Sequence, residues 1–227
     1  MKFAGIQKSS TVDYPGRLSA VLFAPGCDLD CFYCHNRALL SPGAALLAQN
    51  EAWAFLEKRR GLLDGVVLSG GEPILQPGVA QTCARLKAMG YAVKLDTNGQ
   101  HPGRVKALLE EGLLDYIAVD VKALPEQYPR VTRGGSFEAA LACLALAKNA
   151  GVAHEARTTV YPGLDGAALL TLASLLPPLP LWRLNPYRVP ERFHKEDALW
   201  VRAYALSARE LEGMLSALAA RQPSVTV

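Results

Sequence analysis

The stretch "VVLSGGEPILQPGVAQTCARLKAMGYAVKLDTNG", residues 66–99, contains one complete strand–helix–strand unit. Its first β-branched run, Val66–Leu68, ends in the turn-forming "SGGEP". Residues 76–89 have helical periodicity, and a second apolar run, Ala92–Leu95, ends in "DTNG". This order predicts two parallel strands that are joined by a helical crossover.

The same alternation of segments runs along the rest of the chain. The remaining β-branched, apolar runs predict strands at Leu18–Phe23, Tyr116–Val121, Ala156–Tyr161 and Leu181–Leu184. The remaining stretches with helical periodicity predict helices at 44–60, 102–111, 136–150, 165–176 and 207–221. Strand–helix units in series predict an α/β fold with a parallel sheet and right-handed crossovers.

The number of units limits the possible architectures. Six units are too few for a closed eight-stranded barrel, but they are enough for an open three-quarter barrel, that is, a partial (βα)6 TIM-like barrel. A flat doubly wound sheet is the main alternative, and the order of the strands would separate the two. We find no linker that would divide the chain. We therefore expect a single domain over residues 1–227, with a short N-terminal extension of about residues 1–16.

The composition is that of an ordinary globular protein. Half of the 227 residues are hydrophobic, a fifth are charged, and the formal net charge is +3. This small basic excess gives little support for a nucleic-acid or membrane partner. The N-terminus has no apolar core of signal-peptide length, and the longest apolar run, around Leu169–Trp182, is broken by prolines. We therefore expect a cytoplasmic protein with reduced thiols.

Three of the five cysteines, Cys27, Cys31 and Cys34, lie within eight positions in the pattern C-x3-C-x2-C. In a reducing compartment, such a cluster indicates metal binding before disulfides. A structural zinc site has four protein ligands, and the nearby candidate for the fourth is His35, which is adjacent to Cys34. A four-iron cluster fits better, because three thiolates leave one iron open to a substrate or cofactor. A catalytic zinc with three thiolates is the alternative.

Unusual polar residues follow the predicted strands. In parallel α/β folds, active sites gather at the carboxyl ends of strands. Asp120 and Lys122 are spaced i, i+2 in a strand of the buried type, so both should share one face. The general polarity of loops explains the Asn and Gly of turns, but it explains this pair less well. The sequence therefore predicts one site at this rim, with contributions from Ser69, Gly70, Gly71, Glu72, Asp96, Thr97, Asn98, Arg157, Asn185, Tyr187 and Arg188.

Two motifs in this order resemble those of the radical S-adenosylmethionine (SAM) superfamily. They are C-x3-C-x2-C, with Tyr33 before the last cysteine, and the later "SGGEP" turn. The partial (βα)6 barrel is also the fold of that superfamily. The segment "GIQKSSTVDYPGRLSAVLFAPGCDLDCFYCHN", residues 5–36, resembles the opening of anaerobic ribonucleotide reductase activating proteins. "YCHN", "LDTNG" and "DVK" are similarly placed in pyruvate formate-lyase activating enzymes. The resemblance covers essentially the whole chain.

This resemblance implies a role for each matching residue. Cys27, Cys31 and Cys34 would hold a [4Fe–4S] cluster, and SAM would bind at its open iron. Tyr33 and His35 would lie near the adenine. The Gly70–Gly71–Glu72 turn would pair with the methionine amino group, and Glu72 would accept a hydrogen bond from it. Asp96 and Asn98 would line the same pocket, Asp120 and Lys122 would approach the methionine carboxylate, and Arg157 would lie near the nucleoside. Arg188 stands where the relatives often have a histidine, at an expected ribose contact.

The activity that the resemblance implies is that of a radical SAM oxidoreductase. Reductive cleavage of SAM would give a 5′-deoxyadenosyl radical, which would abstract a hydrogen from a backbone glycine of a partner, a glycyl-radical enzyme. The expected partner is anaerobic ribonucleoside-triphosphate reductase, and the expected electron donor is a flavodoxin or ferredoxin. Three alternatives stay open: a pyruvate formate-lyase activating enzyme, a small-molecule radical SAM enzyme such as a deazapurine synthase, and a non-catalytic zinc module. The zinc module would leave the "GGEP" turn without a role.

Overall fold

A single eight-stranded sheet organises the protein. The computed structural model describes residues 1–41 and 43–227. The strands are β1 (Gly5–Ser10), β2 (Ser19–Ala24), β3 (Gly65–Gly70), β4 (Ala92–Thr97), β5 (Tyr116–Asp120), β6 (Ala153–Val160), β7 (Trp182–Pro186) and β8 (Val225–Thr226). β1 pairs antiparallel with β2, and all later pairs are parallel.

The order of the strands in the sheet is the order of the chain, from β1 to β8. A doubly wound sheet requires this order to reverse at a switch point, so that alternative is wrong. The expected α/β fold with a parallel sheet is confirmed, and the strand order is that of a partial TIM-like barrel. The six predicted strands are β2 to β7, whereas β1 lies inside the predicted N-terminal extension.

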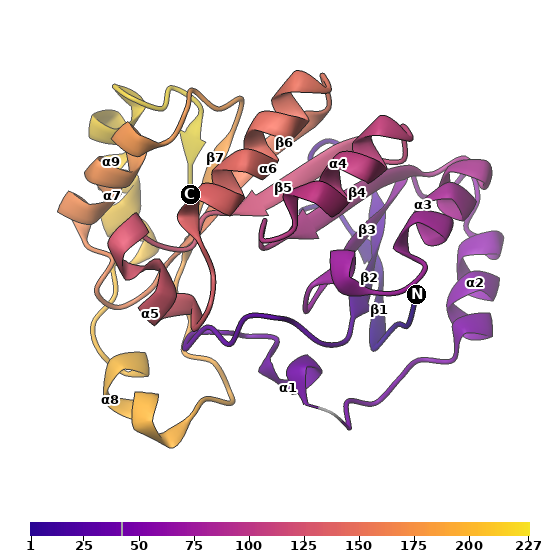
Figure 1. Cartoon of the computed structure of the whole chain (residues 1–227), viewed down its shortest axis with the longest axis horizontal. Coiled ribbons are helices and arrows are strands. Elements are labelled where there is room, and N and C mark those ends of the chain that lie inside the picture. Colours follow the sequence, from indigo (N-terminus) through magenta and orange to yellow (C-terminus); the bar gives the residue numbers. More distant parts are fainter. Residues whose placement is uncertain (42) are drawn as a thin grey trace.

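Helices lie on the outer side of the sheet and below its strands. They are α1 (Arg37–Leu40), α2 (Gln49–Lys58), α3 (Val79–Ala88), α4 (Pro102–Glu110), α5 (Tyr128–Thr132), α6 (Phe137–Asn149), α7 (Gly166–Leu175), α8 (Ala198–Val201) and α9 (Ala208–Ala219). Short 3-10 turns add Pro73–Leu75, Pro125–Gln127 and Lys195–Asp197. Figure 1 shows α2, α3, α4 and α6 beside the strands. α1, α5 and α8 lie below them with the cysteine-bearing loop, residues 25–36.

One predicted helix begins later than expected. The sequence predicts a helix over 44–60, but α2 begins at Gln49. Leu47 forms an isolated antiparallel bridge with Phe3, and its N–H donates to the Phe3 carbonyl at 2.8 Å. The chain before α2 is therefore held in an extended form. The other predicted helices are found with ends shifted by at most three residues.

The two faces of the sheet have different chemistry. On the outer face, residues such as Leu22, Leu68 and Leu95 are fully buried in the main apolar core beneath the helices. On the inner face, Val21 and Val67 form a small apolar cluster with two tyrosines. Farther along the sheet, the inner face of β4 carries Lys94 and Asp96, and β6 carries Glu155 and Arg157. The alternation of the strands thus points charged side chains into the barrel.

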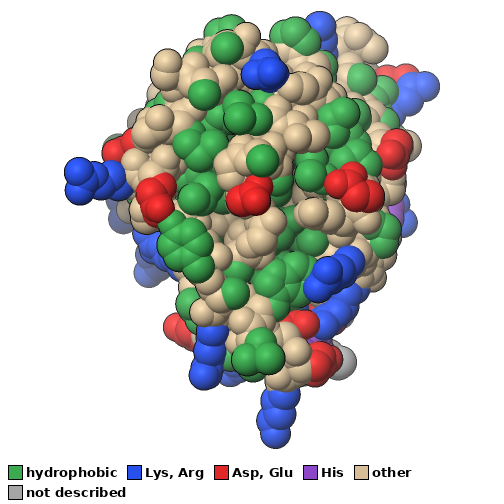
Figure 2. Space-filling model, turned by 90° about the vertical axis from the view of Figure 1, so that its left-hand side faces the viewer, with side chains coloured by type: hydrophobic (Ala, Val, Ile, Leu, Met, Phe, Trp, Pro, Cys, Tyr) green, Lys and Arg blue, Asp and Glu red, His purple; other side chains and the backbone are tan. Residues whose placement is uncertain are grey.

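No helix within residues 1–41 and 43–227 is long and apolar enough to cross a membrane. Figure 2 shows the side formed by α7, α8 and α9, where basic, acidic and apolar side chains are mixed. Large exposed apolar side chains on the whole chain include Leu199 and Tyr204. Isolated apolar side chains of this kind are ordinary on a protein surface.

Candidate active site

A cavity of about 190 Å³ lies at the carboxyl ends of β3 to β6, beneath the cysteine-bearing loop. Fourteen of the sequence-predicted site residues line it: Cys27, Cys31, Tyr33, Cys34, His35, Ser69, Gly70, Gly71, Asp96, Thr97, Asn98, Asp120, Lys122 and Arg157. The rim expected for a parallel α/β fold is therefore where these residues meet. The cavity wall also contains Leu29, Asn36, Leu40 and Thr159. Asn36 belongs to the "YCHN" motif, whereas Thr159 belongs to no motif of the sequence.

All three clustered cysteines are free thiols that face this cavity. Burial raises the pKa of the Cys27 thiol to about 12 and that of the Cys31 thiol to about 11. The Lys122 cation opposes this effect at Cys31 and Cys34. A bound metal would therefore have to displace the thiol protons, as thiolate ligation ordinarily does.

The three thiols share one cavity. Three thiolates do not complete a four-ligand structural zinc site, but they leave one iron of a four-iron cluster open to another ligand. This donor set therefore fits an iron–sulfur cluster better than a structural zinc ion.

The glycine turn after β3 packs directly against the chain before the first cysteine. Gly71 N–H donates to the Ala24 carbonyl at 2.9 Å, and Glu72 N–H donates to the Gly26 carbonyl at 2.8 Å. A Cβ on Gly71 would lie 1.9 Å from the Gly26 oxygen, so only glycine fits here. The Asn36 amide donates to the Gly70 carbonyl at 2.8 Å. The turn and the cysteine-bearing loop are thus one packed unit.

Glu72 does not line the cavity. Its side chain is completely buried, and its carboxylate accepts hydrogen bonds from the Thr97 hydroxyl at 2.9 Å and from the Asn98 N–H at 2.6 Å. Burial raises the pKa of Glu72 to about 7, against the effect of these hydrogen bonds. In the structure, this carboxylate therefore links the β3 and β4 turns.

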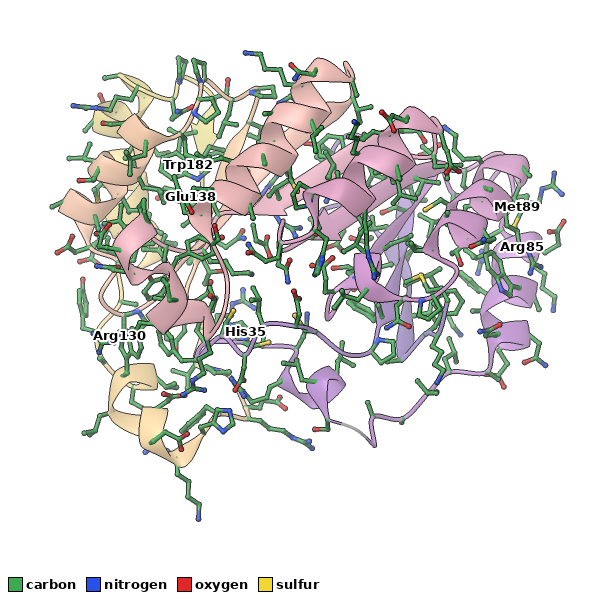
Figure 3. The ribbon with its side chains drawn as sticks, in the orientation of Figure 1. His35, Arg85, Met89, Arg130, Glu138 and Trp182 are labelled. Carbon is green, nitrogen blue, oxygen red and sulfur yellow. The ribbon has the colours of Figure 1, made fainter. Side chains whose placement is uncertain are left out.

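Arg188 also lies outside the cavity lining, and its side chain is exposed. It is close enough to His35 for its positive charge to lower the pKa of that imidazole, although burial of the ring is the larger cause. In Figure 3, His35 lies on the loop that leads to α1, below the strands of the barrel. The region of His35 and Arg188 is therefore the side of the cavity that faces outward.

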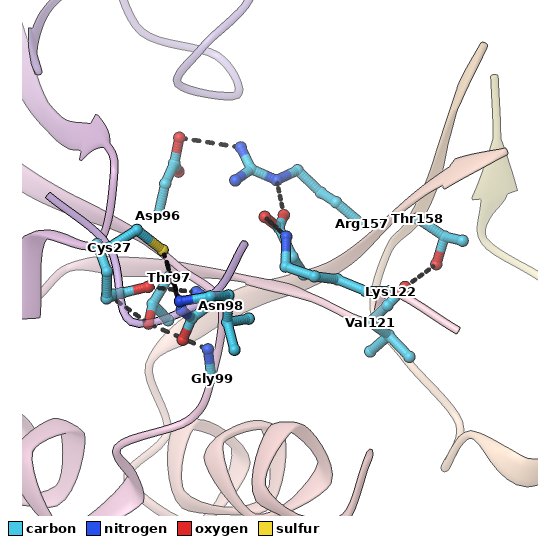
Figure 4. A network of polar contacts seen from close by, with 12 residues as sticks. Cys27, Asp96, Thr97, Asn98, Gly99, Val121, Lys122, Arg157 and Thr158 are labelled. Atoms are coloured by element: carbon cyan, nitrogen blue, oxygen red, sulfur yellow. Dashed lines mark hydrogen bonds and ion pairs between the residues drawn. The ribbon is translucent and has the colours of Figure 1, made fainter. Parts of the chain in front are cut away.

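A ladder of alternating charges crosses the inner face of the sheet (Figure 4). Lys94 Nζ lies 2.7 Å from Asp96 Oδ1. Arg157 bridges two carboxylates, with Nη1 at 2.9 Å from Asp96 and Nε at 3.0 Å from Asp120. The ladder ends at Lys122, whose Nζ lies 3.0 Å from Asp120 Oδ2. The predicted shared face of Asp120 and Lys122 is thus confirmed.

The ladder fixes the ionisation of its carboxylates. Burial alone would raise the pKa of Asp120, but the charges of Lys122 and Arg157 outweigh it and lower the pKa to about 2. At Asp96 the charges of Arg157 and Lys94 likewise outweigh burial and lower the pKa. Lys94 is 1% exposed and went unnoticed in the sequence, because its strand otherwise has the pattern of a buried apolar strand. Both carboxylates are therefore charged at neutral pH, and Arg157 is held between them.

The protein is a member of the radical SAM superfamily. The model of that superfamily matches residues 21–176, more than half of the 227 residues. This match contains the cysteine motif, the glycine turn and the charge ladder. The cofactors of the superfamily are a [4Fe–4S] cluster and SAM, and the three free thiols at the cavity supply the donor set that such a cluster needs.

Individual relatives match to different extents. A Methanocaldococcus jannaschii protein named "Putative glycyl-radical enzyme activating enzyme" is 32% identical over 200 residues, which cover 85% of this chain and 82% of that protein. A Methanococcus maripaludis "Probable GTP 3′,8-cyclase" is 29% identical over 117 residues, covering 50% of this chain but only 39% of the cyclase. A radical SAM methyltransferase from Sphaerobacter thermophilus has a similar fold, with a TM-score of 0.71 at 20% identity over 94% of this chain and 67% of that one.

Proposed function

We propose that this protein activates a glycyl-radical enzyme: it cleaves SAM and removes one hydrogen atom from a backbone glycine of the partner. The observation that carries the proposal is the similarity to the named activating enzyme over 85% of this chain and 82% of the relative. The similarity to the cyclase leaves most of that enzyme's length unmatched. A whole-length match supports a shared reaction better than a match to the common core does.

Within this proposal, Cys27, Cys31 and Cys34 hold the cluster. When bound and reduced, the cluster supplies the electron that cleaves SAM into methionine and a 5′-deoxyadenosyl radical. Lys122, anchored by Asp120 at 3.0 Å, offers a cation to the methionine carboxylate. The backbone of Gly70 and Gly71 is open to close approach by the amino group, because neither residue has a Cβ.

The nucleoside end of SAM is assigned to other residues of the cavity wall. We place the adenine beside Tyr33 and His35, and the nucleoside near Arg157, with Asp96 and Asn98 completing the wall. The Tyr33 ring is stacked on Tyr161 with 5.0 Å between centroids, so its orientation is fixed before any ligand binds. This chain's residues thus orient SAM and exclude water, while the cofactors supply the reactive chemistry.

The partner that we propose is anaerobic ribonucleoside-triphosphate reductase. Its support is the resemblance of residues 5–36 to the opening of that reductase's activating proteins. In the structure, this segment contains β1, β2 and the whole cysteine-bearing loop. Pyruvate formate-lyase would be activated by the same chemistry. We propose a cytoplasmic location and a flavodoxin or ferredoxin as electron donor.

The decisive experiment is anaerobic incubation of the reduced, cluster-loaded protein with SAM and each candidate partner. Electron paramagnetic resonance should show a glycyl radical on the reductase, and 5′-deoxyadenosine should form in step with it. The signal should disappear with Cys31→Ala and with a partner whose radical glycine is replaced by alanine. SAM cleavage without any partner radical, together with turnover of a purine substrate, would instead support the small-molecule function that the cyclase similarity favours.

A further inference from the structure

The cysteine-bearing loop contains two carboxylates that have no part in the proposed chemistry. The sequence "CDLDC", residues 27–31, places Asp28 and Asp30 between the first two cysteines. Asp28 is about one-third exposed and Asp30 slightly more, so both are partly open to solvent. Each one nevertheless makes several contacts to residues far away in the sequence. These contacts lie on different parts of the fold.

Asp28 is attached to the loop that follows β4. Its Oδ1 accepts from the Asn98 amide at 2.8 Å, and its Oδ2 lies 2.8 Å from His101 Nε2. Asn98 also approaches the Cys27 sulfur, at 3.7 Å. The Asn98 backbone is in turn held by Glu72. The first cysteine is thus tied to the side of the site formed by the β3 and β4 turns.

Asp30 is attached to a different set of elements. Its carboxylate lies 2.5 Å from Arg37 Nη1, 2.8 Å from His194 Nε2 and 3.3 Å from Arg133 Nη1. Arg37 also donates to the carbonyl of Cys31 at 2.7 Å. Arg133 also forms a salt bridge with Asp197 at 2.8 Å. The second cysteine is therefore tied to α1 and to the segment before α8.

Backbone and aromatic contacts support the second attachment. The Asp30 N–H donates to the Thr132 carbonyl at 3.0 Å, and the Phe32 N–H donates to the Val131 carbonyl at 3.3 Å. The Phe32 ring is stacked on Trp200 of α8, with 3.7 Å between centroids. The loop is thus held at its two ends by different parts of the chain.

We propose that Asp28 and Asp30 are positioning residues for the iron–sulfur cluster. Attached to different elements of the fold, they hold Cys27 and Cys31 in place for the cluster, and they slow its loss. Partners in the outer shell of a metal site typically change metal affinity by about 10–100-fold when they are removed. Exposed ion pairs elsewhere on a protein contribute little to its stability. A positioning role and an ordinary surface ion pair therefore predict measurably different effects when the carboxylates are removed. The proposal concerns cluster retention and is independent of which hydrogen is abstracted.

The test uses the cluster-loaded protein and a colourless iron chelator under anaerobic conditions. Loss of the cluster is followed by its visible absorption and by iron and sulfide content, and its environment by electron paramagnetic resonance after reduction. We expect Asp28→Asn and Asp30→Asn each to lose the cluster at least about tenfold faster than the parent protein and to alter the resonance signal. Asp30→Glu, which keeps the charge, should recover part of the loss.

Asp115→Asn is the matched control. Asp115 is 33% exposed and pairs with Lys87 at 2.6 Å, but it lies at the amino end of β5, away from the cavity. This variant should retain its cluster like the parent protein. Should either loop variant fail to fold, His101→Gln and His194→Gln probe the same contacts from their partners. Release rates and resonance signals that match those of Asp115→Asn in all of these variants would overturn the proposal.

Discussion

At Gly71, very little space separates the glycine turn after β3 from the chain before the first cysteine. Its Cα faces the Gly26 carbonyl so closely that any side chain would overlap a backbone atom, which cannot move aside as a flexible side chain does. The adjacent Gly70 has a φ of +111° and is also closed in by the backbone of Ala24. Glycine is therefore required here for two separate reasons: the close approach of the backbone at both positions, and the positive φ at Gly70.

Gly71→Ala should displace the turn and the cysteine-bearing loop together. We expect the free energy of unfolding to fall by about 3 kcal/mol, the upper end for overpacking, and SAM binding to the cluster-loaded protein to be lost. Gly103→Ala in α4 is the control, because a Cβ at this position would have no neighbour within 4 Å, and its stability should stay the same or rise by up to about 1 kcal/mol. Denaturant unfolding and equilibrium SAM binding measure both effects; equal behaviour of the two variants would contradict this account.

Individual site residues differ in how well the sequence predicts them. The cysteines, the glycine turn and the Asp120–Lys122 pair have local spacing that indicates their chemistry. Lys94 and Glu155 have none, because their salt-bridge contact at 3.5 Å joins strands that are 61 positions apart in the chain. Glu72 has a clear motif, but whether its carboxylate faces a ligand or the protein depends on the β4 turn, which only the folded structure places beside it.

At the scale of helices and strands, length decides what a periodic pattern can predict. The helices of nine residues or more each show a predicted pattern, whereas α1, α5 and α8 have only four or five residues, too few for helical periodicity to be visible. These three short helices nevertheless carry or adjoin Arg37, Arg133 and Trp200, which hold the cysteine-bearing loop. β1 escaped prediction because its sequence, "GIQKSS", is polar and largely exposed at the edge of the sheet.

The N-terminus of α6 offers a test of an element that borders the site without entering it. Ser136 accepts from the Ala139 N–H at 3.3 Å as the helix cap, and its backbone is bonded to Gln100, next to the β4 turn. Ser136→Ala should lower the free energy of unfolding by about 1 kcal/mol and leave SAM affinity unchanged, since the backbone bonds remain. Ser174→Ala, at an exposed position of α7, should change stability by less than about 0.5 kcal/mol. A large fall in SAM affinity for Ser136→Ala would show that the cap shapes the site.

Across the whole molecule, the charge ladder connects the strands that form the site. Its members lie on β4, β5 and β6, except for Lys122, which follows β5. The ladder therefore joins neighbouring strands through side chains as well as backbone. Arg157 is its centre, since it is the cation shared by two carboxylates. The strand order, which the sequence left open between two architectures, is what brings these strands together.

Arg157→Met should therefore weaken the protein as a whole. Removing one partner of a buried ion pair leaves uncompensated charge, and we expect the free energy of unfolding to fall by about 3 kcal/mol. Lys106→Met is the control, because Lys106 pairs with Glu110 at 3.6 Å on α4 and both side chains are more than half exposed; its loss should cost less than about 1 kcal/mol. Urea unfolding of the cluster-free protein measures both, and a smaller effect for Arg157→Met than for Lys106→Met would be inconsistent with this view of the ladder.

The contacts of the cysteine-bearing loop also determine when, during synthesis of the chain, this loop can take its final form. Because each strand pairs with its neighbour in sequence, the sheet can grow from the N-terminus as residues leave the ribosome. The cysteines are made early, by residue 34, but the partners of Asp30 include His194. The loop thus acquires its full set of contacts only after the chain has been synthesised as far as His194. A fully shaped site can therefore receive iron only after that point.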